Sequence, residues 1–425
     1  MVGAFGVVGS VVAMLRPDAG GTAWLPSIVA GGIGALTLWF LVGRLRPVPD
    51  EPVTTGAQFS QGDESGPRSP DRRKFFAWTG AATVAGVLAI AAGSVRSSGA
   101  AAVTAVRRAL RLPTPAKVAP PIPESAELRI PGLAKVITPN DAFYRIDTAL
   151  IIPEIDPADW SLRVHGMVEN EFTLSWDELL ALPLEESVTT LACVSNPVGG
   201  ELIGNALWLG YPIRELLARA RPTSDADMVL SMSRDGFTAS TPIEALTDDR
   251  DAILAVGMNG EPLPLQHGFP VRMVVPGLYG YVSATKWVTS LEVTRFDQVK
   301  AYWSTRGWSE RGPIKLQSRI DVPRRSQGLK AGETVIAGVA WQQHVGVSGV
   351  EVQIDEGEWV PATLATAISD DTWVQWSMPW NATAGDHLIR CRAIGADGEV
   401  QTSDTAAVAP DGATGWHERF ITVFA

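Results

Sequence analysis

The stretch VTTLACVSNPVGGELIGNALWLGYPIRELL, from Val188 to Leu217, contains a cysteine at the point where a strand should end. Cys193 follows a β-type run and precedes residues 195–200, SNPVGG, which are turn-forming. We therefore expect Cys193 at the start of a tight loop. A thiolate in such a loop can ligate a metal, whereas the alternative for a lone cysteine among apolar residues is a small buried hydrophobe.

The rest of this stretch distinguishes the two alternatives. After the double glycine the chain reads Gly204-Asn205-Ala206-x-Trp208-x-Gly210, and Pro212 opens an amphipathic helix. The whole stretch closely resembles the cysteine loop of the sulfite oxidase superfamily, whose cysteine sulfur ligates molybdenum held by a pyranopterin dithiolene. The resemblance implies that Cys193 is the metal ligand and that Asn196 orients its loop.

A second segment, HGFPVRMVVPGLYGYVSATKWVTSLEV, begins at His267. It resembles the cofactor-phosphate motif of the same superfamily, His-Gly-x-Pro-x-Arg followed by Lys-Trp. His267, Arg272 and Lys286 are then expected to bind the cofactor phosphate, and Ser283 and Thr285 to add hydroxyl donors. Taken singly, each basic residue would be a satisfied surface or edge residue.

A third segment is PNDAFYRID, residues 139–147. Asn140, Phe143, Tyr144 and Arg145 align with the N-terminal pterin-binding strand of the superfamily. The resemblance implies that Arg145 faces the metal and the substrate oxyanion and is catalytic, together with the cysteine. The alternative for Arg145 is a surface ion pair with a nearby aspartate. Asp235, in RDGFTASTP, matches an aspartate that contacts the pterin, although Asp-Gly alone indicates only a turn.

The substrate pattern of sulfite oxidases is kept less well than the cofactor pattern. Pro197 and Val198 stand where the family carries an arginine, Val256 stands where it carries an active-site tyrosine, and Asp147 replaces a histidine. Specificity depends on such contacts and not on the fold. Sulfite oxidation and reduction of an S-oxide, as in the methionine sulfoxide reductases of the superfamily, therefore both stay open. A non-enzymatic membrane-tethered scaffold is the remote alternative and would need neither metal nor Cys193.

The composition of the chain argues against several classes of partner and cofactor. The formal net charge of −11 over 425 residues argues against a nucleic-acid partner. Two cysteines and five histidines, without a Cys-x-x-Cys pair, give no sign of a zinc, iron–sulfur or haem centre in this chain. The cofactor implied is thus molybdenum-molybdopterin alone. Its substrate would be a small or sulfur-containing molecule, and its electrons would pass to an external carrier, for which a membrane protein is one candidate.

The N-terminal quarter is predicted to enter the membrane. Residues 1–43 are read as transmembrane segments, the first of them truncated, and residues 44–74 as a disordered cytoplasmic loop. Arg72 and Arg73 precede an apolar run and resemble a twin-arginine export signal, the alternative being an ordinary positively charged flank. Residues 75–95 would anchor the chain in the cell membrane, with everything after them extracytoplasmic. Residues 96–126 are predicted as a linker, with a short helix within residues 100–112.

Two folded domains are expected after the linker. Residues 127–317 would form the mixed α+β molybdopterin-binding domain, in which Ser175 and Glu178 are spaced as a helix capping box. From residue 318 to residue 425, short strands alternate with Gly and Asp turns and resemble the immunoglobulin-like β-sandwich that follows the molybdenum domain in the superfamily. Cys391 alternates with apolar residues there and is expected in the core. By analogy with the family, this sandwich implies a homodimer.

Overall fold

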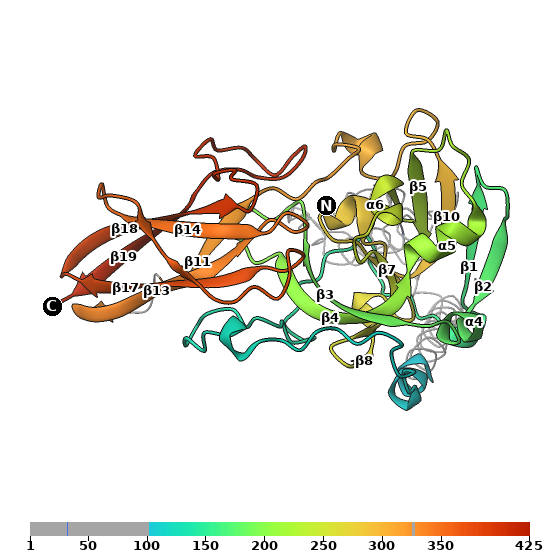
Figure 1. The fold of residues 1–425 in the computed structure, drawn as a ribbon, viewed down its shortest axis with the longest axis horizontal. Coiled ribbons are helices and arrows are strands. Elements are labelled where there is room, and N and C mark those ends of the chain that lie inside the picture. The colour runs from blue at the N-terminus through green and yellow to red at the C-terminus, as the bar shows by residue number, and fades with distance from the viewer. Residues whose placement is uncertain (1–31, 33–101, 325–327) are drawn as a thin grey trace, which may run out of the picture. The chain divides into compact units, whose positions relative to one another are not determined.

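The computed structural model describes Gly32, residues 102–324 and residues 328–425 (Figure 1). Apart from Gly32, the predicted membrane spans and the twin-arginine segment lie outside the described residues. Among the residues that are described, no helix combines the length and the apolar character that a membrane crossing requires. A helix covers residues 102–109, within the stretch predicted as helical.

The first folded region contains two five-stranded sheets and short helices, so it is mixed α and β as predicted. One sheet has the order β2-β1-β10-β5-β6, and the parallel pair of β1 with β10 joins segments far apart in the sequence. The other has the order β3-β4-β7-β8, with β9 also paired to β7. The strands of the first sheet are β2 (Phe172–Ser175), β1 (Ser161–Gly166), β10 (Val288–Thr294), β5 (Met228–Ser233) and β6 (Thr238–Pro242). Those of the second are β3 (Glu185–Ala192), β4 (Ile203–Pro212), β7 (Ile253–Met258), β8 (Glu261–Pro262) and β9 (Arg272–Val274).

Local sequence signals set the helices of this region. Ser175 caps α4 (Trp176–Leu180), and its hydroxyl and the Glu178 carboxylate satisfy each other's backbone N–H groups, which confirms the predicted capping box. Pro212 ends β4 and leads into α5 (Ile213–Ala220), whose apolar face is buried. The remaining helices are α6 (Glu244–Thr247), α7 (Gly280–Ser283) and the 3-10 turns η1 (Glu124–Ala126), η2 (Pro157–Asp159), η3 (Leu265–His267) and η4 (Ser304–Arg306).

The C-terminal region, residues 317–424, consists of two sheets that share one apolar core. Their orders are β11-β13-β17-β16 and β12-β19-β18-β14-β15. Cys391 is fully buried between them, as predicted. The strands are β11 (Gln317–Val322), β12 (Leu329–Lys330), β13 (Gly332–Trp341), β14 (Val347–Ile354), β15 (Val360–Pro361), β16 (Thr363–Leu364), β17 (Val374–Ala382), β18 (Gly385–Gly395) and β19 (His417–Phe424). Membership of the immunoglobulin-like class, and a role in dimerisation, stay predictions.

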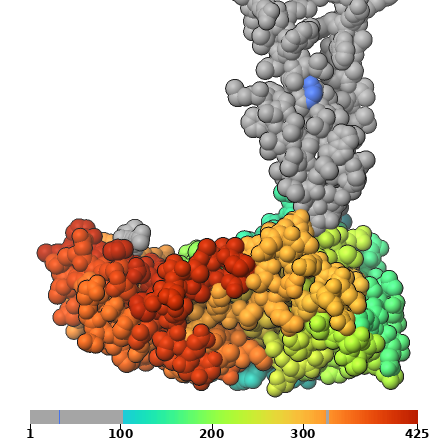
Figure 2. Space-filling model, turned by 90° about the horizontal axis from the view of Figure 1, so that it is seen from above, coloured from blue at the N-terminus to red at the C-terminus, as the bar shows by residue number. Residues whose placement is uncertain are grey.

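The segment predicted as a linker is bound to both regions. Ala116 N donates to Leu184 O at 2.7 Å and Glu186 N to Lys117 O at 2.9 Å, so the segment covers the first half of edge strand β3. An exposed strand edge offers unpaired backbone groups, and this pairing satisfies them. Further along, Thr366 N, between β16 and β17, donates to Ser125 O at 3.1 Å, and the two hydroxyls lie 2.8 Å apart. In Figure 2 the two regions accordingly form one continuous surface.

Candidate functional site

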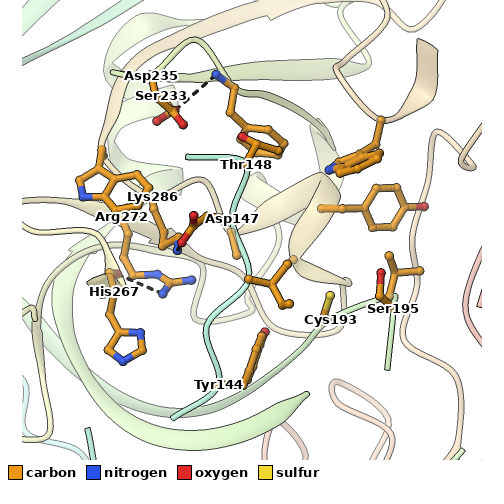
Figure 3. Close-up of a pocket in the computed structure, with 18 of the residues that line it drawn as sticks. Tyr144, Asp147, Thr148, Cys193, Ser195, Ser233, Asp235, His267, Arg272 and Lys286 are labelled. Atoms are coloured by element: carbon orange, nitrogen blue, oxygen red, sulfur yellow. Dashed lines mark hydrogen bonds and ion pairs between the residues drawn. The ribbon is translucent and has the colours of Figure 1, made fainter. Parts of the chain in front are cut away.

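One pocket collects residues from all three segments that the sequence singled out (Figure 3). It contains about 900 Å³ of empty space, part of it open to solvent. In Figure 3, Cys193 and Ser195 lie on one side, while His267, Arg272 and Lys286 gather on the other. The predicted residues that line it are Phe143, Tyr144, Cys193, Asp235, His267, Arg272 and Lys286.

Cys193 lies at the start of the loop between β3 and β4. Its N–H donates to Leu202 O at 2.9 Å, which continues the β3–β4 pairing by one step, and its side chain reaches the pocket while only 8% of the residue is exposed. Burial raises the pKa of the thiol, and hydrogen bonds from the backbone and side chain of Ser195 offset this only in part. A thiolate here therefore needs a cation, and a metal ion would supply one.

Arg272, at the start of β9, is a buried cation without an acidic partner. Its Nη1 donates to His267 O at 3.1 Å and its Nε to Met273 O at 3.3 Å. No carboxylate of the described residues lies within ion-pair distance of it, and burial lowers the pKa of the guanidinium to about 10. Buried charges are normally paired. This side chain is consequently set up for an anion that is not part of the chain.

His267 is neutral and has a defined tautomer. Burial, reinforced by the nearby Arg272, lowers its pKa to about 4. Its Nε2 lies 3.0 Å from Asn140 O, and a carbonyl only accepts, so Nε2 carries the proton. Gly268 follows with φ +110°, and a Cβ there would contact Arg272 Cβ at 3.0 Å and Lys286 Cβ at 3.2 Å. Glycine thus lets the turn after His267 pack closely against both Arg272 and Lys286.

Lys286 is the second cation, and it is paired. Its Nζ lies 2.7 Å from Asp147 Oδ2 and 3.1 Å from Gln266 O. Burial lowers the pKa of the ammonium to about 8, although Asp147 opposes this shift. Burial also disfavours ionisation of Asp147, but hydrogen bonds and charge from Arg145 and Lys286 outweigh it and lower the pKa of the carboxyl.

Arg145 does not line the pocket. Its Nε is 2.9 Å from Asp147 Oδ2, and 43% of its side chain is exposed. This is the ion pair that the sequence left open as the alternative. The role of Arg145 at the metal stays a prediction, and in this structure its contribution to the pocket is to hold Asp147, which sequence reasoning had not counted as a site residue.

Four other predicted residues do not line the pocket but form hydrogen bonds near it. Asn140 presents its carbonyl to His267, while its side chain bonds Asn259 and Glu261. Asn196 Oδ1 accepts from Leu202 N at 2.9 Å and so closes the cysteine loop, as expected. Ser283 and Thr285 are fully buried and bind, respectively, the carbonyl of Tyr279 and the hydroxyl of Ser231. Their hydroxyls are not pocket donors.

Two other hydroxyls, which the sequence analysis did not single out, are available as donors in the pocket. Thr148 Oγ1 and Ser233 Oγ are buried, have no hydrogen-bond partner, and belong to residues that line the pocket. Asp235 is 8% exposed, and its carboxylate receives only a long contact of 3.5 Å from Phe237 N. The sequence signal was available for Ser233 alone, since it precedes Asp235 at the end of a strand. These polar atoms are therefore free to bind a ligand that enters the pocket.

An aromatic wall forms the rest of the pocket and was not predicted. It consists of Phe237, Tyr281, Trp303 and Trp308, with ring centroids 5.9 Å apart for Tyr281 and Trp308 and 6.0 Å for the two tryptophans. Tyr281 donates its hydroxyl to Ser309 O at 2.8 Å and therefore presents its ring. The two tryptophans come from residues 301–313, near the end of the first predicted domain, where no motif marks them.

Of the positions at which the chain departs from sulfite oxidases, one, Asp147, lines the pocket, where it pairs with Lys286. Val256 is fully buried in β7, and neither it nor Pro197 or Val198 is among the lining residues. Among the described residues, the lining cations are therefore Arg272 and Lys286 only, both on the side opposite Cys193 (Figure 3).

Comparison with known proteins identifies relatives of the chain. Residues 149–303 match the family model described as the oxidoreductase molybdopterin binding domain. The chain is 28% identical to sulfite oxidase of Gallus gallus over 323 residues, which cover 64% of this chain and 70% of that protein. It is 31% identical over 157 residues to the uncharacterized oxidoreductase YuiH of Bacillus subtilis strain 168, covering 37% of this chain and 76% of that one. It spans 58% of the length of the rat and human mitochondrial sulfite oxidases.

The fold has a solved counterpart. The sulfane dehydrogenase SoxCD of Paracoccus pantotrophus superposes with a TM-score of 0.59 at 23% identity, over 68% of this chain and 81% of that chain. This likeness concerns the fold alone. The family model and the relatives carry the assignment to a family. The chain is an oxidoreductase that belongs to the sulfite oxidase superfamily of molybdopterin-binding proteins.

Proposed function

We propose that this protein is a molybdenum-cofactor oxidoreductase that transfers an oxygen atom to or from a sulfur-containing substrate and passes electrons to an external carrier. The observation that carries the proposal is the pairing, in one pocket, of a buried cysteine with a buried guanidinium that has no acidic partner. The first needs a metal and the second needs an anion. A molybdenum pterin with a terminal phosphate provides both.

The residues present fit this cofactor. Arg272, Lys286 and the neutral His267 would hold the phosphate, the first two by charge and His267 by fixing Asn140 and the turn before Gly268. Thr148 and Ser233 have free hydroxyls for the heterocycle, and Asp235 has a carboxylate with spare acceptor capacity. Cys193 offers the soft ligand.

Each side chain then has a defined task. The bound cofactor would supply the metal that exchanges an oxygen atom and stores two electrons. Cys193 would hold that metal with a side chain that lines the pocket and is almost fully buried. Tyr144 keeps its proton, since burial and then the nearby Cys193 raise the pKa of the phenol far above its usual value. Its hydroxyl is thus a hydrogen-bond donor in the pocket at every physiological pH.

Reduction of an uncharged S-oxide is the second candidate, and one observation favours it. On the side of Cys193 the pocket has no lining cation among the described residues, and a bound phosphate would engage Arg272 and Lys286. No lining cation among the described residues would then be left for a second anion, whereas the carboxylate of Asp235 would remain. A dianion such as sulfite would then be repelled, whereas a neutral molecule with a small organic group could pack on Trp303 and Trp308.

We further propose that the chain is anchored in the cell membrane by its N-terminal quarter, with the catalytic region outside the cytoplasm. The support is the order of apolar runs and arginines in residues 1–95, including Arg72 and Arg73. Protease treatment of intact spheroplasts, which degrades only an external catalytic region, tests this orientation.

The metal assignment predicts a specific loss in Cys193→Ser. The full chain, produced in cells that make the cofactor, should contain about one molybdenum and one pterin, and the variant should keep its fold and much of its pterin while losing turnover of sulfite and of S-oxides. Elemental and pterin analysis beside activity assays provide the measurement. Cys391→Ser is the control and should keep both molybdenum and turnover. Full turnover in Cys193→Ser would remove the ligand assignment.

The unpaired guanidinium predicts opposite effects on stability and on cofactor content. Arg272→Met should leave the cofactor-free protein as stable as the wild type or more stable by up to about 3 kcal/mol, because a buried charge without a partner is removed. Its pterin content should fall at least about tenfold, as expected for a lost charge-assisted bond. Thermal unfolding and pterin fluorescence measure the two effects.

Arg250→Met is the matched control for Arg272→Met. Arg250 pairs with Asp248 at 2.7 Å and binds Pro276 O, so its loss should lower stability and leave the pterin content unchanged. If Arg272→Met were as destabilising as this control without loss of pterin, Arg272 would be a structural residue.

The low pKa of Lys286 predicts a pH-dependent affinity for phosphate. In the cofactor-free protein the ammonium loses its proton as the pH rises through about 8, so affinity for pyrophosphate should fall progressively above that pH. The same lowered pKa means that the folded state binds fewer protons than the unfolded state above pH 8, so stability should rise over that range. Calorimetric titration between pH 7 and pH 10 checks the first trend. Lys286→Arg should abolish it, because a guanidinium stays charged; a pH profile identical to wild type would contradict the assignment.

Charge selectivity distinguishes the two substrate classes. Sulfate and dimethyl sulfone share a tetrahedral sulfur but differ in charge, so ligand-detected NMR on the cofactor-loaded protein compares them directly. If the second candidate is right, dimethyl sulfone binds and sulfate does not, and Trp308→Ala weakens binding about tenfold. Trp359→Ala, on the far aromatic pair with Trp416, is the control. Tight sulfate binding, displaced by sulfite, would favour sulfite oxidation instead.

A further inference from the structure

The loop that carries Cys193 is bound by the first strand of the C-terminal region. Arg319, in β11, donates from Nη1 to Gly200 O at 2.9 Å, and its Nε lies 2.7 Å from Asp321 Oδ1. The two side chains are 8% and 9% exposed. Asp321 Oδ2 in turn accepts from Ala134 N at 2.9 Å. The guanidinium of this buried ion pair therefore donates a hydrogen bond to a backbone carbonyl of the cysteine loop.

A second contact comes from the last strand of the same region. Gly199 has φ +74°, and a Cβ at this position would collide with the ring of His417, at the start of β19. The ring is itself fixed, because its Nδ1 accepts from Ile320 N at 2.8 Å. Glycine is thus required at Gly199 for two reasons: it allows the turn, and it allows the C-terminal region to approach the loop closely.

The strand before the loop is held in the same way. β3 is an edge strand of its sheet. Both the backbone N–H and the backbone C=O of Thr190, three residues before Cys193, bind residues of the C-terminal region. Thr190 N donates to Asp371 O at 3.0 Å, and Thr190 O accepts from Gln343 Nε2 at 3.1 Å. Trp373 N donates to the Thr190 hydroxyl at 2.9 Å. Strand and loop are therefore fixed from the same side.

We propose that the C-terminal region positions Cys193 for the metal, and that Arg319 is the principal positioning residue. The inference rests on the proposed function in that Cys193 is taken as the ligand. A metal ligand must be held to about 0.5 Å by its surroundings. The loop's own closing bonds are those of Asn196 and Leu202, and Arg319 adds a charge-assisted bond at its distal end.

The nature of the Arg319–Asp321 pair supports a positioning role. A buried ion pair is weak evidence for stability, because the cost of removing both charges from water offsets most of their attraction. The pair does, however, fix the orientation of the Arg319 guanidinium. The planar guanidinium is oriented by Asp321, so the remaining N–H points at Gly200 O with a fixed geometry. Lysine could pair with Asp321 but could not make both contacts in one plane.

Hydrogen exchange of the full chain tests the proposal without relying on turnover. In Arg319→Met, the amides of residues 193–202 should exchange about tenfold faster or more, as expected for loss of a charge-assisted bond. Peptides covering residues 385–395, in the core of the C-terminal region, should keep their protection. Arg319→Lys keeps the pairing with Asp321 and so safeguards folding, yet it should leave the loop equally fast in exchange.

A matched control separates the loop contact from general stability. Arg392 lies in β18 and pairs with Glu351 at 2.7 Å. In the described part of the chain it makes no hydrogen bond or ion pair with residues 193–202. Arg392→Met should leave loop exchange unchanged. If the loop kept its protection in Arg319→Met, or if loop and core accelerated together by the same factor, the positioning role would be wrong.

The cofactor-loaded protein provides an independent readout. X-ray absorption at the molybdenum edge should show a broadened metal–sulfur shell in Arg319→Lys, with molybdenum content within twofold of wild type. Failure of the wild-type chain to bind molybdenum would overturn the proposed function and leave the exchange result standing. Normal molybdenum binding with an unchanged loop and an unchanged sulfur shell in the variants would overturn the positioning role alone.

Discussion

The positive charge of Arg272 is the constraint on which the rest of the site depends. A guanidinium that is almost fully buried, with only carbonyl partners, costs free energy unless an anion completes it. Lys286 avoids this cost through Asp147, and Asp147 is in turn kept ionised by Arg145. One open positive site thus stays in the pocket, and it is the place where an anion would be bound most favourably.

The fold sets the distance between this charge and the cysteine sulfur. Both come from the sheet β3-β4-β7-β9, Cys193 from the end of its edge strand and Arg272 from the start of the strand beyond β7. Because these strands are paired in register, the two ends of the pocket cannot shift independently. The C-terminal region adds to this rigidity, since it covers the open edge of β3.

Sequence reasoning found the parts of the site that carry a local pattern. Cys193, His267, Arg272 and Lys286 are in motifs with fixed spacing, and all four line the pocket. It failed where the tertiary fold decides the direction of a side chain. Ser283 and Thr285 were expected as donors but bond inward, whereas the free hydroxyls are those of Thr148 and Ser233. Side-chain direction within a short irregular segment is not encoded in spacing, and Trp303 and Trp308 carry no periodicity that could mark them.

The two ends of the pocket are built on different kinds of structure. The end that carries Arg272 and Lys286 lies on paired segments, since β9 pairs with β7 and Arg272 forms a bridge with Lys286. The opposite end is made by Tyr281 and Trp308, which lie in a short helix and a loop. Tyr281 binds a loop carbonyl, and Trp308 contacts its ring. Their replacement would alter the shape and polarity of the aromatic wall while the register of β3, β4 and β7 stays as it is. An end built on paired strands and a wall built on a short helix and a loop can therefore vary separately, which is how one fold comes to accommodate different chemistry.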